Sequence, residues 1–232
     1  MERLEIKLLG TFKARLDGEV LTGFRSDKTR ALLAYLAVEN TRPHRRDWLA
    51  ALLWGNYNDR AARRSLSSAL ANLRQLLSPL GSFATLDASR SDVWLQTSPD
   101  LATVDVTRLR ELLSWTGSHA HRSLIYCDAC SERLAQATDI YTGSFLPGMT
   151  FGDCPAFDEW QRTQQETLHQ QVLEALDTQT LRHLAAAHFD QAETFARRQL
   201  SLQPWHESAH RQLMLALASS GQRNAALAQY DL

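Results

Sequence analysis

The sequence predicts a mainly α-helical protein, with a small α+β domain at its N-terminus and an all-helical part after it. Three observations predict this class. Residues 4–16 alternate apolar and polar side chains, as a half-buried strand does. From Ser26 the apolar residues recur at helical spacing, until a hairpin pattern interrupts them at residues 83–97. From residue 103 to the C-terminus the apolar patterns are again helical.

The composition is that of a globular protein. Of the 232 residues, 44% are hydrophobic and 22% are charged. No apolar run approaches the roughly 18 residues that suggest a membrane span, and the N-terminus alternates where a signal peptide would be continuously apolar. The three cysteines are too few for a secreted disulfide framework. We therefore expect a cytoplasmic protein.

Charge is unevenly distributed along the chain. Residues 1–100 hold 15 basic and 11 acidic side chains, whereas residues 101–232 hold 10 basic and 15 acidic ones. Within residues 25–74 the count is 10 basic to 4 acidic. One basic domain in a chain of net charge −1 suggests a polyanion partner for that domain, and the alternative is a local fluctuation of composition.

The first elements follow in order from the N-terminus. Residues 4–16 place Leu4, Ile6 and Leu8 on one strand face, and Asp17-Gly18 is a hairpin signal after which Val20 begins the return. The first helix, predicted from Ser26, contains ALLAYLAVEN, with apolar residues at helical spacing. A second helix, RRDWLAALLW, follows Pro43 and ends at Gly55.

Residues 59–77, with the sequence DRAARRSLSSALANLRQLL, form the third predicted helix. Asn58 or Asp59 can cap it, because a side-chain oxygen there accepts from backbone N–H groups that have no helical partner. Its leucines form one stripe at helical spacing: Leu66, Leu70, Leu73 and Leu77. Pro79 and Gly81 end the helix. The runs FATLD and VWLQT, around the polar tip ASRSD, then predict a hairpin.

The second part of the chain predicts only helices and one long loop. VDVTRLRELLSW and CSERLAQATDIY are two helices, and Gly143 stops the second. The Gly- and Pro-containing segment TGSFLPGMTFGDCP predicts a loop. A long helix follows from about Phe157 to His169 and beyond.

The C-terminal part contains a weak repeat with a period of 34 residues. Asp190 corresponds to Asn224, and the turn residues Ala187 and Gly221 have the same separation. Upstream, Ala175 pairs with Ala209 and Leu181 pairs with Leu215. This period, with small residues where paired helices approach closely, is typical of tetratricopeptide repeats, and the alternative is two unrelated amphipathic helices.

The repeat array ends inside its last helix, at Tyr230, Asp231 and Leu232. Stacked repeats need a capping helix to cover the exposed apolar face. Either the sequence is a fragment of a longer protein or a partner covers this face, and we expect a fragment.

Residues 1–97 resemble an OmpR-type winged helix-turn-helix domain, through KTRALLAYLAVE, RRDWLAALLW and SLSSALANLRQLL. Residues 103–232 resemble the bacterial transcriptional activator domain. The matching segments there are VDVTRLRELL, YTGSFLPG, PAFDEWQRTQQETL and QPWHESAHRQLMLALASSGQRNAALAQY. Together the two domains resemble transcriptional regulators of the Streptomyces antibiotic regulatory protein (SARP) type.

The resemblance implies a DNA-binding activator whose third helix enters the major groove of promoter repeats. It also implies contact with RNA polymerase and a homodimer on direct repeats. The lack of a long apolar run leads us to expect no membrane partner. The chain departs from the pattern at Arg45, where a Ser or Thr cap is expected, and we expect that it stops before the activator domain is complete. Larger members of the family often contain a nucleotide-binding ATPase module as well.

The third helix provides the candidate DNA-contacting residues. Opposite the leucine stripe lie Arg64, Ser68 and Asn72, and we expect these three to contact bases, since Asn pairs with adenine and Arg with guanine. Arg63 and Arg74 are expected to bind phosphates, with Arg60 also at the flank. By analogy with the family, Ser65 faces the groove together with Ser68 and Asn72.

Three further arginines extend this candidate surface. Arg90, at the hairpin tip, is placed to reach the flanking minor groove, and Arg45 and Arg46 open the second helix, whose N-terminus favours a phosphate. The alternative for each arginine, taken singly, is an ordinary solvated charge. The group of arginines on one helix face, in this order of elements, favours DNA binding.

A second cluster of chemistry-bearing residues lies in the string HAHRSLIYCDAC. His119, His121, Cys127 and Cys130 could supply two imidazoles and two thiolates, a tetrahedral set for a structural zinc ion. Alternatively, the cysteines are simply buried and the histidines lie in a loop, or Cys154 replaces one histidine. The motif lacks the glutamate that a zinc deaminase needs.

No signature of an enzyme is present. The sequence has neither a glycine-rich phosphate loop nor a G-x-S-x-G motif, and adjacent Asp158 and Glu159 point apart on a helix. Phe157, Trp160 and Trp205 are expected to pack in the core or between helices. The second function class that we consider is a protein-interaction module built on the tetratricopeptide-like helices, with a winged helix that does not bind DNA.

Overall fold

The computed structural model describes residues 4–78, 84–97 and 102–231. Its contacts divide the chain into two compact units, one of residues 1–108 and 142–166 and one of residues 109–141 and 167–232. The loop after residue 142 and the start of the following helix thus group with the N-terminal elements. The expected domain boundary between residues 97 and 103 remains a prediction. None of the helices in the described part is long and apolar enough to cross a membrane.

A four-stranded sheet lies in the first unit, in the order β3-β2-β1-β7. The predicted strand of residues 4–16 is two strands, β1 (Leu4–Lys7) and β2 (Lys13–Leu16), because Gly10 turns the chain with φ +91°. Antiparallel β3 (Glu19–Val20) returns as predicted. β7 (Ala102–Val104), which the sequence did not predict, pairs in parallel with β1. The face of β1 that the alternation predicted as apolar is buried.

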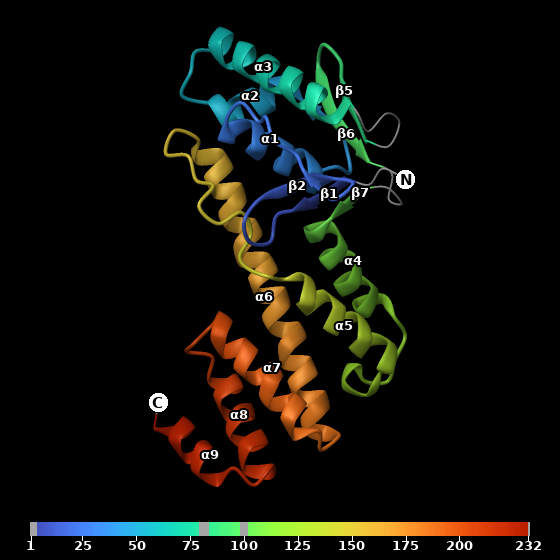
Figure 1. The fold of residues 1–232 in the computed structure, drawn as a ribbon, viewed down its shortest axis with the longest axis vertical. Coiled ribbons are helices and arrows are strands. Elements are labelled where there is room, and N and C mark those ends of the chain that lie inside the picture. The colour runs from blue at the N-terminus through green and yellow to red at the C-terminus, as the bar shows by residue number, and fades with distance from the viewer. Residues whose placement is uncertain (1–3, 79–83, 98–101, 232) are drawn as a thin grey trace. The chain divides into compact units, whose positions relative to one another are not determined.

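Three helices and a hairpin complete the N-terminal part of this unit (Figure 1). α1 (Asp27–Val38) is capped by Ser26 and buried on most sides. α2 (Arg46–Trp54) follows a short strand, β4 (His44–Arg45), and its N-cap Arg45 makes no side-chain cap bond. α3 (Asp59–Leu77) is capped by Asn58. The predicted ends at Pro79 and Gly81 lie outside the described residues.

The predicted hairpin is confirmed as β5 (Ala84–Ala88) and β6 (Asp92–Thr97). It forms a second sheet with β4, in the order β4-β6-β5. Val93 and Leu95 point into the core, so the alternation along β6 fixes which face of the hairpin packs on the helices. Sheet, three helices and hairpin therefore follow in the predicted order.

The loop that begins at Thr142 pairs with residues 8–10, which directly follow β1. Ser144 accepts a backbone hydrogen bond from Gly10 (2.9 Å), and Leu146 donates one to Leu8 (2.8 Å). A Cβ on Gly143 would lie 3.2 Å from the Cα of Gly10, a tight contact, so glycine at this position favours the close approach of the two segments. Phe145 and Leu146 are fully buried, which explains why this loop belongs to the first unit.

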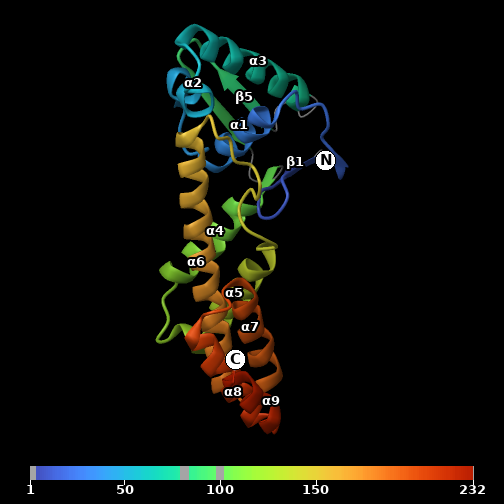
Figure 2. The same ribbon diagram turned by 90° about the vertical axis from the view of Figure 1, so that its left-hand side faces the viewer.

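The remaining elements are helical, as predicted. α4 (Asp105–Ser118), a 3₁₀ turn η2 (Leu124–Tyr126) and α5 (Asp128–Ile140) precede the long α6 (Pro155–Ala185). The antiparallel helices α7 (Phe189–Leu202), α8 (Glu207–Ser219) and α9 (Arg223–Tyr230) follow (Figure 2). Phe157 is buried and Trp160 packs between Tyr35 and Phe145, as expected. Trp205 is 85% exposed, so its expected packing role is wrong.

The 34-residue repeat is visible in the backbone. Ala187 and Gly221 both have positive φ, 58° and 86°. The residue after each closes the same turn, since His188 donates to the carbonyl of His183 and Gln222 to that of Leu217, both at 2.8 Å. The small residues at the helix crossings, Ala192, Ala196, Ala209 and Ala216, are fully buried. The predicted repeat is therefore a real structural period.

Candidate nucleic-acid interface

α3 has one buried side and one exposed side. Its N-terminus is fixed by Asn58, whose Oδ1 accepts a hydrogen bond from the backbone N–H of Ala61 at 2.9 Å. The predicted leucine stripe faces the core, together with Ala62 and Ala69: Leu66, Leu70, Leu73 and Leu77 are at most 3% exposed. This burial fixes the rotation of the helix, and with it the residues that solvent can reach.

The exposed side of α3 holds most of the predicted DNA contacts. Arg60, Arg63, Arg64, Ser68 and Arg74 are all exposed, and Ser65 is half-buried at its edge. Among the described residues, neither Arg60 nor Arg64 has an ion-pair partner. Their guanidinium groups are therefore available to a ligand.

Asn72 does not belong to this surface, which corrects the sequence prediction. Its side chain is 3% exposed, and both atoms of its amide are occupied. Oδ1 accepts from the backbone N–H of Arg25 (3.0 Å), and Nδ2 donates to the carbonyl of Gly23 (3.1 Å). Asn72 therefore holds the segment before α1 against α3, and it is removed from the set of proposed base contacts.

Two of the predicted arginines, Arg63 and Arg46, make side-chain contacts between α2 and α3. Arg63 Nε lies 3.0 Å from Asp47 Oδ1, and both side chains are more than 60% exposed, so water and salt screen this pair. Arg46 donates from one guanidinium nitrogen to Ser67 Oγ at 2.9 Å. These contacts orient the side chains across the junction of α2 and α3 without burying their charge.

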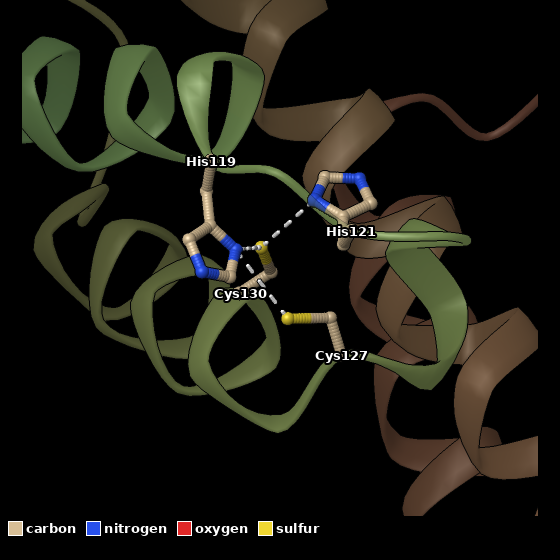
Figure 3. Close-up of side chains that lie close together, drawn as sticks. All are labelled: His119, His121, Cys127 and Cys130. Carbon is tan, nitrogen blue, oxygen red and sulfur yellow. Dashed lines mark hydrogen bonds between the residues drawn. The ribbon is translucent and has the colours of Figure 1, made fainter.

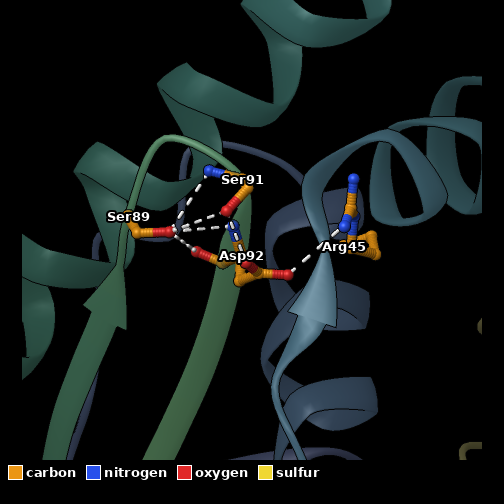
Figure 4. Close-up of polar contacts among 4 residues, drawn as sticks. All are labelled: Arg45, Ser89, Ser91 and Asp92. Atoms are coloured by element: carbon orange, nitrogen blue, oxygen red, sulfur yellow. Dashed lines mark hydrogen bonds and ion pairs between the residues drawn. The ribbon is translucent and has the colours of Figure 1, made fainter.

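The hairpin tip lies beside the start of α2 (Figure 4). Ser89 Oγ accepts from the backbone N–H groups of Ser91 (3.2 Å) and Asp92 (3.0 Å), which closes the turn. The backbone N–H of Arg46 donates to the carbonyl of Ser91 at 2.8 Å, and Arg45 Nε lies 4.0 Å from Asp92 Oδ1. The tip is therefore held against the first turn of α2.

Arg74 connects the same hairpin to α3, since it donates to the carbonyl of Ala88 at 2.9 Å. Arg90 stands exposed at the tip. Together, the exposed side of α3, the start of α2 and the hairpin hold seven arginines (45, 46, 60, 63, 64, 74 and 90) and four aspartates (47, 59, 87 and 92). The surplus of three positive charges suits this surface to a polyanion.

Sequence reasoning missed three positions on the exposed side of α3: Ser67, Ala71 and Gln75. Each recurs at helical spacing from Arg60 or Arg64, so the leucine stripe alone would have shown that they share this side. Gln can pair with adenine, and the methyl group of Ala can contact that of thymine. Gln75 and Ala71 are therefore suitable replacements for Asn72 as base contacts.

The second predicted site is also brought together by the fold. His119, His121, Cys127 and Cys130 each offer a ligand atom, and these atoms all lie within 4.8 Å of one another. Burial, followed by the neighbouring Cys127 thiol, raises the pKa of Cys130. Cys154 is not part of this group, because its thiol donates to the carbonyl of Leu53 at 2.9 Å.

Residues 104–232, more than half of the chain, match the family described as the bacterial transcriptional activator domain. Over 230 residues the chain is 28% identical to the regulatory protein AfsR of Streptomyces coelicolor. This match covers 98% of this chain and 21% of AfsR. A stretch of 80 residues is 36% identical to the transcriptional regulatory protein EmbR of Mycobacterium tuberculosis, covering 34% of this chain and 20% of EmbR. Each of these matches thus spans about a fifth of the length of the relative.

A solved structure is similar to the whole chain. It is M. tuberculosis EmbR in complex with a low-affinity phosphopeptide, and it superposes with a TM-score of 0.71 at 21% identity. The likeness covers 100% of this chain and 59% of the EmbR chain. At this identity it shows that the two proteins share a fold.

Proposed function

The chain belongs to the bacterial transcriptional activator domain family of transcriptional regulators, and from that premise we propose that it is an activator that binds promoter DNA sequence-specifically. Its resemblance to SARP-type regulators is confirmed by the likeness to AfsR and EmbR. We propose that residues 1–97 form the DNA-binding domain and that residues 103–232 form the activator domain.

One observation supports DNA binding above the others. α3 is fixed by its buried leucines, so that arginines and small polar residues occupy one solvent-exposed side over its whole length. An α-helix fits the major groove of B-form DNA, where base edges offer distinct donor and acceptor patterns. Because the arginines are exposed and only weakly paired, they can exchange water for phosphate or base without breaking a buried contact.

The proposed contacts divide into two kinds. Arg64 and Ser68, with Gln75 and Ala71 beyond them, contact base edges in the major groove. Phosphates are bound by arginines on the flanks of α3 and at the start of α2: Arg45, Arg46, Arg60, Arg63 and Arg74. Arg90, at the hairpin tip, enters the neighbouring minor groove. Ser65 lies at the edge of the helix face, where it can donate to a phosphate.

The predicted binding has a strong dependence on salt. If these five arginines neutralise between four and five phosphates per protomer on average, the slope of log K against log salt concentration is about −4. A pool of random duplexes, selected on the purified chain, should converge on one repeated sequence, and fluorescence anisotropy at several salt concentrations should return this slope. A pool that does not converge, with no duplex retained at low salt, refutes the proposal.

The partners follow from the family rather than from particular contacts. We propose that the activator contacts RNA polymerase at the promoter, that two copies occupy direct repeats of the target sequence, and that the protein acts in the cytoplasm. Footprinting with and without RNA polymerase tests this. Recruitment should extend the protected region toward the promoter core, and an unchanged footprint argues against polymerase contact.

A second candidate function, a protein-interaction module, is favoured by exposed apolar side chains in the C-terminal helices and in the turn between α7 and α8. These are Trp205, Leu215, Leu227 and Tyr230, each more than half exposed. A folded chain that retains a protein partner but shifts no duplex would support this function over DNA binding.

A further inference from the structure

The connection between α4 and α5 places two histidines and two cysteines around one point (Figure 3). His119 directly follows the last residue of α4, Cys127 is the N-cap of α5, and Cys130 lies in the first turn of that helix. His121 approaches from the intervening segment. Four side chains from three pieces of backbone thus converge, although nothing in the family resemblance requires them to do so.

The separations of the ligand atoms fit a tetrahedral metal site. His119 Nδ1 lies 3.3 Å from Cys130 Sγ and 3.6 Å from Cys127 Sγ, and His121 Nδ1 lies 3.6 Å from Cys130 Sγ. Around a tetrahedral zinc ion, with Zn–S of about 2.3 Å and Zn–N of about 2.0–2.1 Å, sulfur and nitrogen stand about 3.6 Å apart. All three measured separations are close to that value.

Neighbouring side chains hold one of the imidazoles in place. The ring of His119 stacks on that of Trp115, with centroids 4.4 Å apart and planes at 16°. The guanidinium carbon of Arg133 in turn lies over the Trp115 ring, 3.4 Å from its centroid. A ligand whose orientation is fixed before the metal arrives loses less conformational freedom on binding.

We propose that His119, His121, Cys127 and Cys130 bind one structural zinc ion. Two thiolates and two imidazoles suit zinc above the hard cations, which prefer oxygen ligands. Four protein ligands leave no position for substrate, so the site is structural. When the ion binds, the thiols lose their protons to solvent and form Zn–S bonds, with no change in oxidation state.

The ion would fasten the end of α4 to the start of α5. Between these points the chain forms η2, where the carbonyl of Ile125 accepts from Arg182 of α6 at 2.9 Å. Zinc therefore stabilises the same segment that α6 contacts through Arg182. Its loss is expected to loosen this part of the second unit while leaving the DNA-contacting helix, in the first unit, folded.

The experiment measures metal in the chain of residues 1–232, purified under reducing conditions without chelator and after removal of any affinity tag. Elemental analysis should find about one zinc per chain. Cys127→Ser/Cys130→Ser should hold essentially none. Cys154→Ser, which keeps a donor for the Leu53 carbonyl, is the matched control and should retain the full content.

Cobalt gives a second readout that does not depend on stability. Apoprotein titrated with Co²⁺ should develop the strong visible bands of a tetrahedral ion and a sulfur-to-metal charge-transfer band, and Zn²⁺ should abolish both. Trp115→Leu should weaken zinc binding by about tenfold, whereas the exposed Trp205→Leu should not. If the serine double variant does not fold, this titration of the wild-type apoprotein still decides the question.

Three outcomes would overturn the proposal. One is zinc well below one equivalent together with no cobalt spectrum from reduced apoprotein. Another is equal zinc in the wild type and the double serine variant. The third is a disulfide between Cys127 and Cys130, seen as a mass lower by two hydrogens, in protein that fails to bind metal after reduction.

Discussion

Replacement of Asn72 by alanine separates the structural role of this residue from a role in DNA recognition. The structure gives Asn72 two hydrogen bonds, one from the backbone N–H of Arg25 and one to the carbonyl of Gly23. Asn72→Ala removes both bonds and leaves two backbone groups without their partner. We therefore expect the variant to be less stable and to discriminate between DNA sequences as the wild type does.

The magnitude follows from the two lost bonds. Each hydrogen bond contributes about 1 kcal/mol net, with a further cost where water cannot replace the partner. Alanine is a better helix former than asparagine by about 0.5 kcal/mol, which offsets part of the loss. The expected net destabilisation is about 2 kcal/mol, or a fall in Tm of about 6 °C for a unit of this size.

Thermal unfolding by circular dichroism measures the stability, and binding to specific and unrelated duplexes, well below Tm, measures the discrimination. Ser68→Ala on the exposed side of the same helix is the matched control, and it should not lower Tm, because it removes no buried hydrogen bond and alanine favours the helix. An Asn72→Ala variant with the wild-type Tm that no longer distinguishes the two duplexes would refute the reasoning.

Four further results are expected. Arg64→Ala should reduce the preference for the specific duplex by about tenfold without changing Tm, whereas Arg74→Ala should weaken all duplexes alike and make the salt slope shallower by about 1. An unchanged preference in the first variant would remove Arg64 from the base contacts. Asp47→Asn should tighten binding by roughly threefold at low salt, because it removes a negative charge from the surface and frees Arg63; weaker binding would contradict this. Burial, then the charges of His188 and Arg182, hold the pKa of His183 below its ordinary 6.5, so the unfolded chain takes up a proton first as the pH falls. The stability that His183 contributes is therefore fully present above about pH 6.5, and it is lost as the pH falls from there through the folded-state pKa of His183. His183→Gln should flatten this part of the curve of Tm against pH, and an unaltered slope would exclude His183 as its cause.

Much of the fold could be predicted because its signals are local. The leucine stripe of α3 and the hairpin pattern each depend on neighbouring residues, the 34-residue period depends on recurrence along the chain, and all three are confirmed. The strand β7 and the packing of the loop after Thr142 on β1 could not be predicted, because they depend on pairing between residues about 100 or more positions apart. A pattern within a window of a few residues contains no information about such partners.

The candidate site shows the same division. Hydrophobic period identified the exposed side of α3 and most of its arginines, but it could not show that a polar side chain is buried. Asn72 has a side chain that is able to contact a base. It instead hydrogen-bonds the backbone of Gly23 and Arg25, because these residues lie next to it in the folded chain. Conversely, the sequence grouped two histidines and two cysteines, and the backbone turn then brought them within reach of one ion.

The most direct test of the central claim compares specific and non-specific DNA binding by the wild type and Arg64→Ala across a range of salt concentrations. The account predicts that the wild type prefers one selected duplex, that log K falls with log salt at a slope of about −4, and that Arg64→Ala reduces the preference by about tenfold while keeping most of the slope. Binding that shows no sequence preference in the wild type, or a preference that Arg64→Ala leaves intact, would contradict recognition by the exposed side of α3.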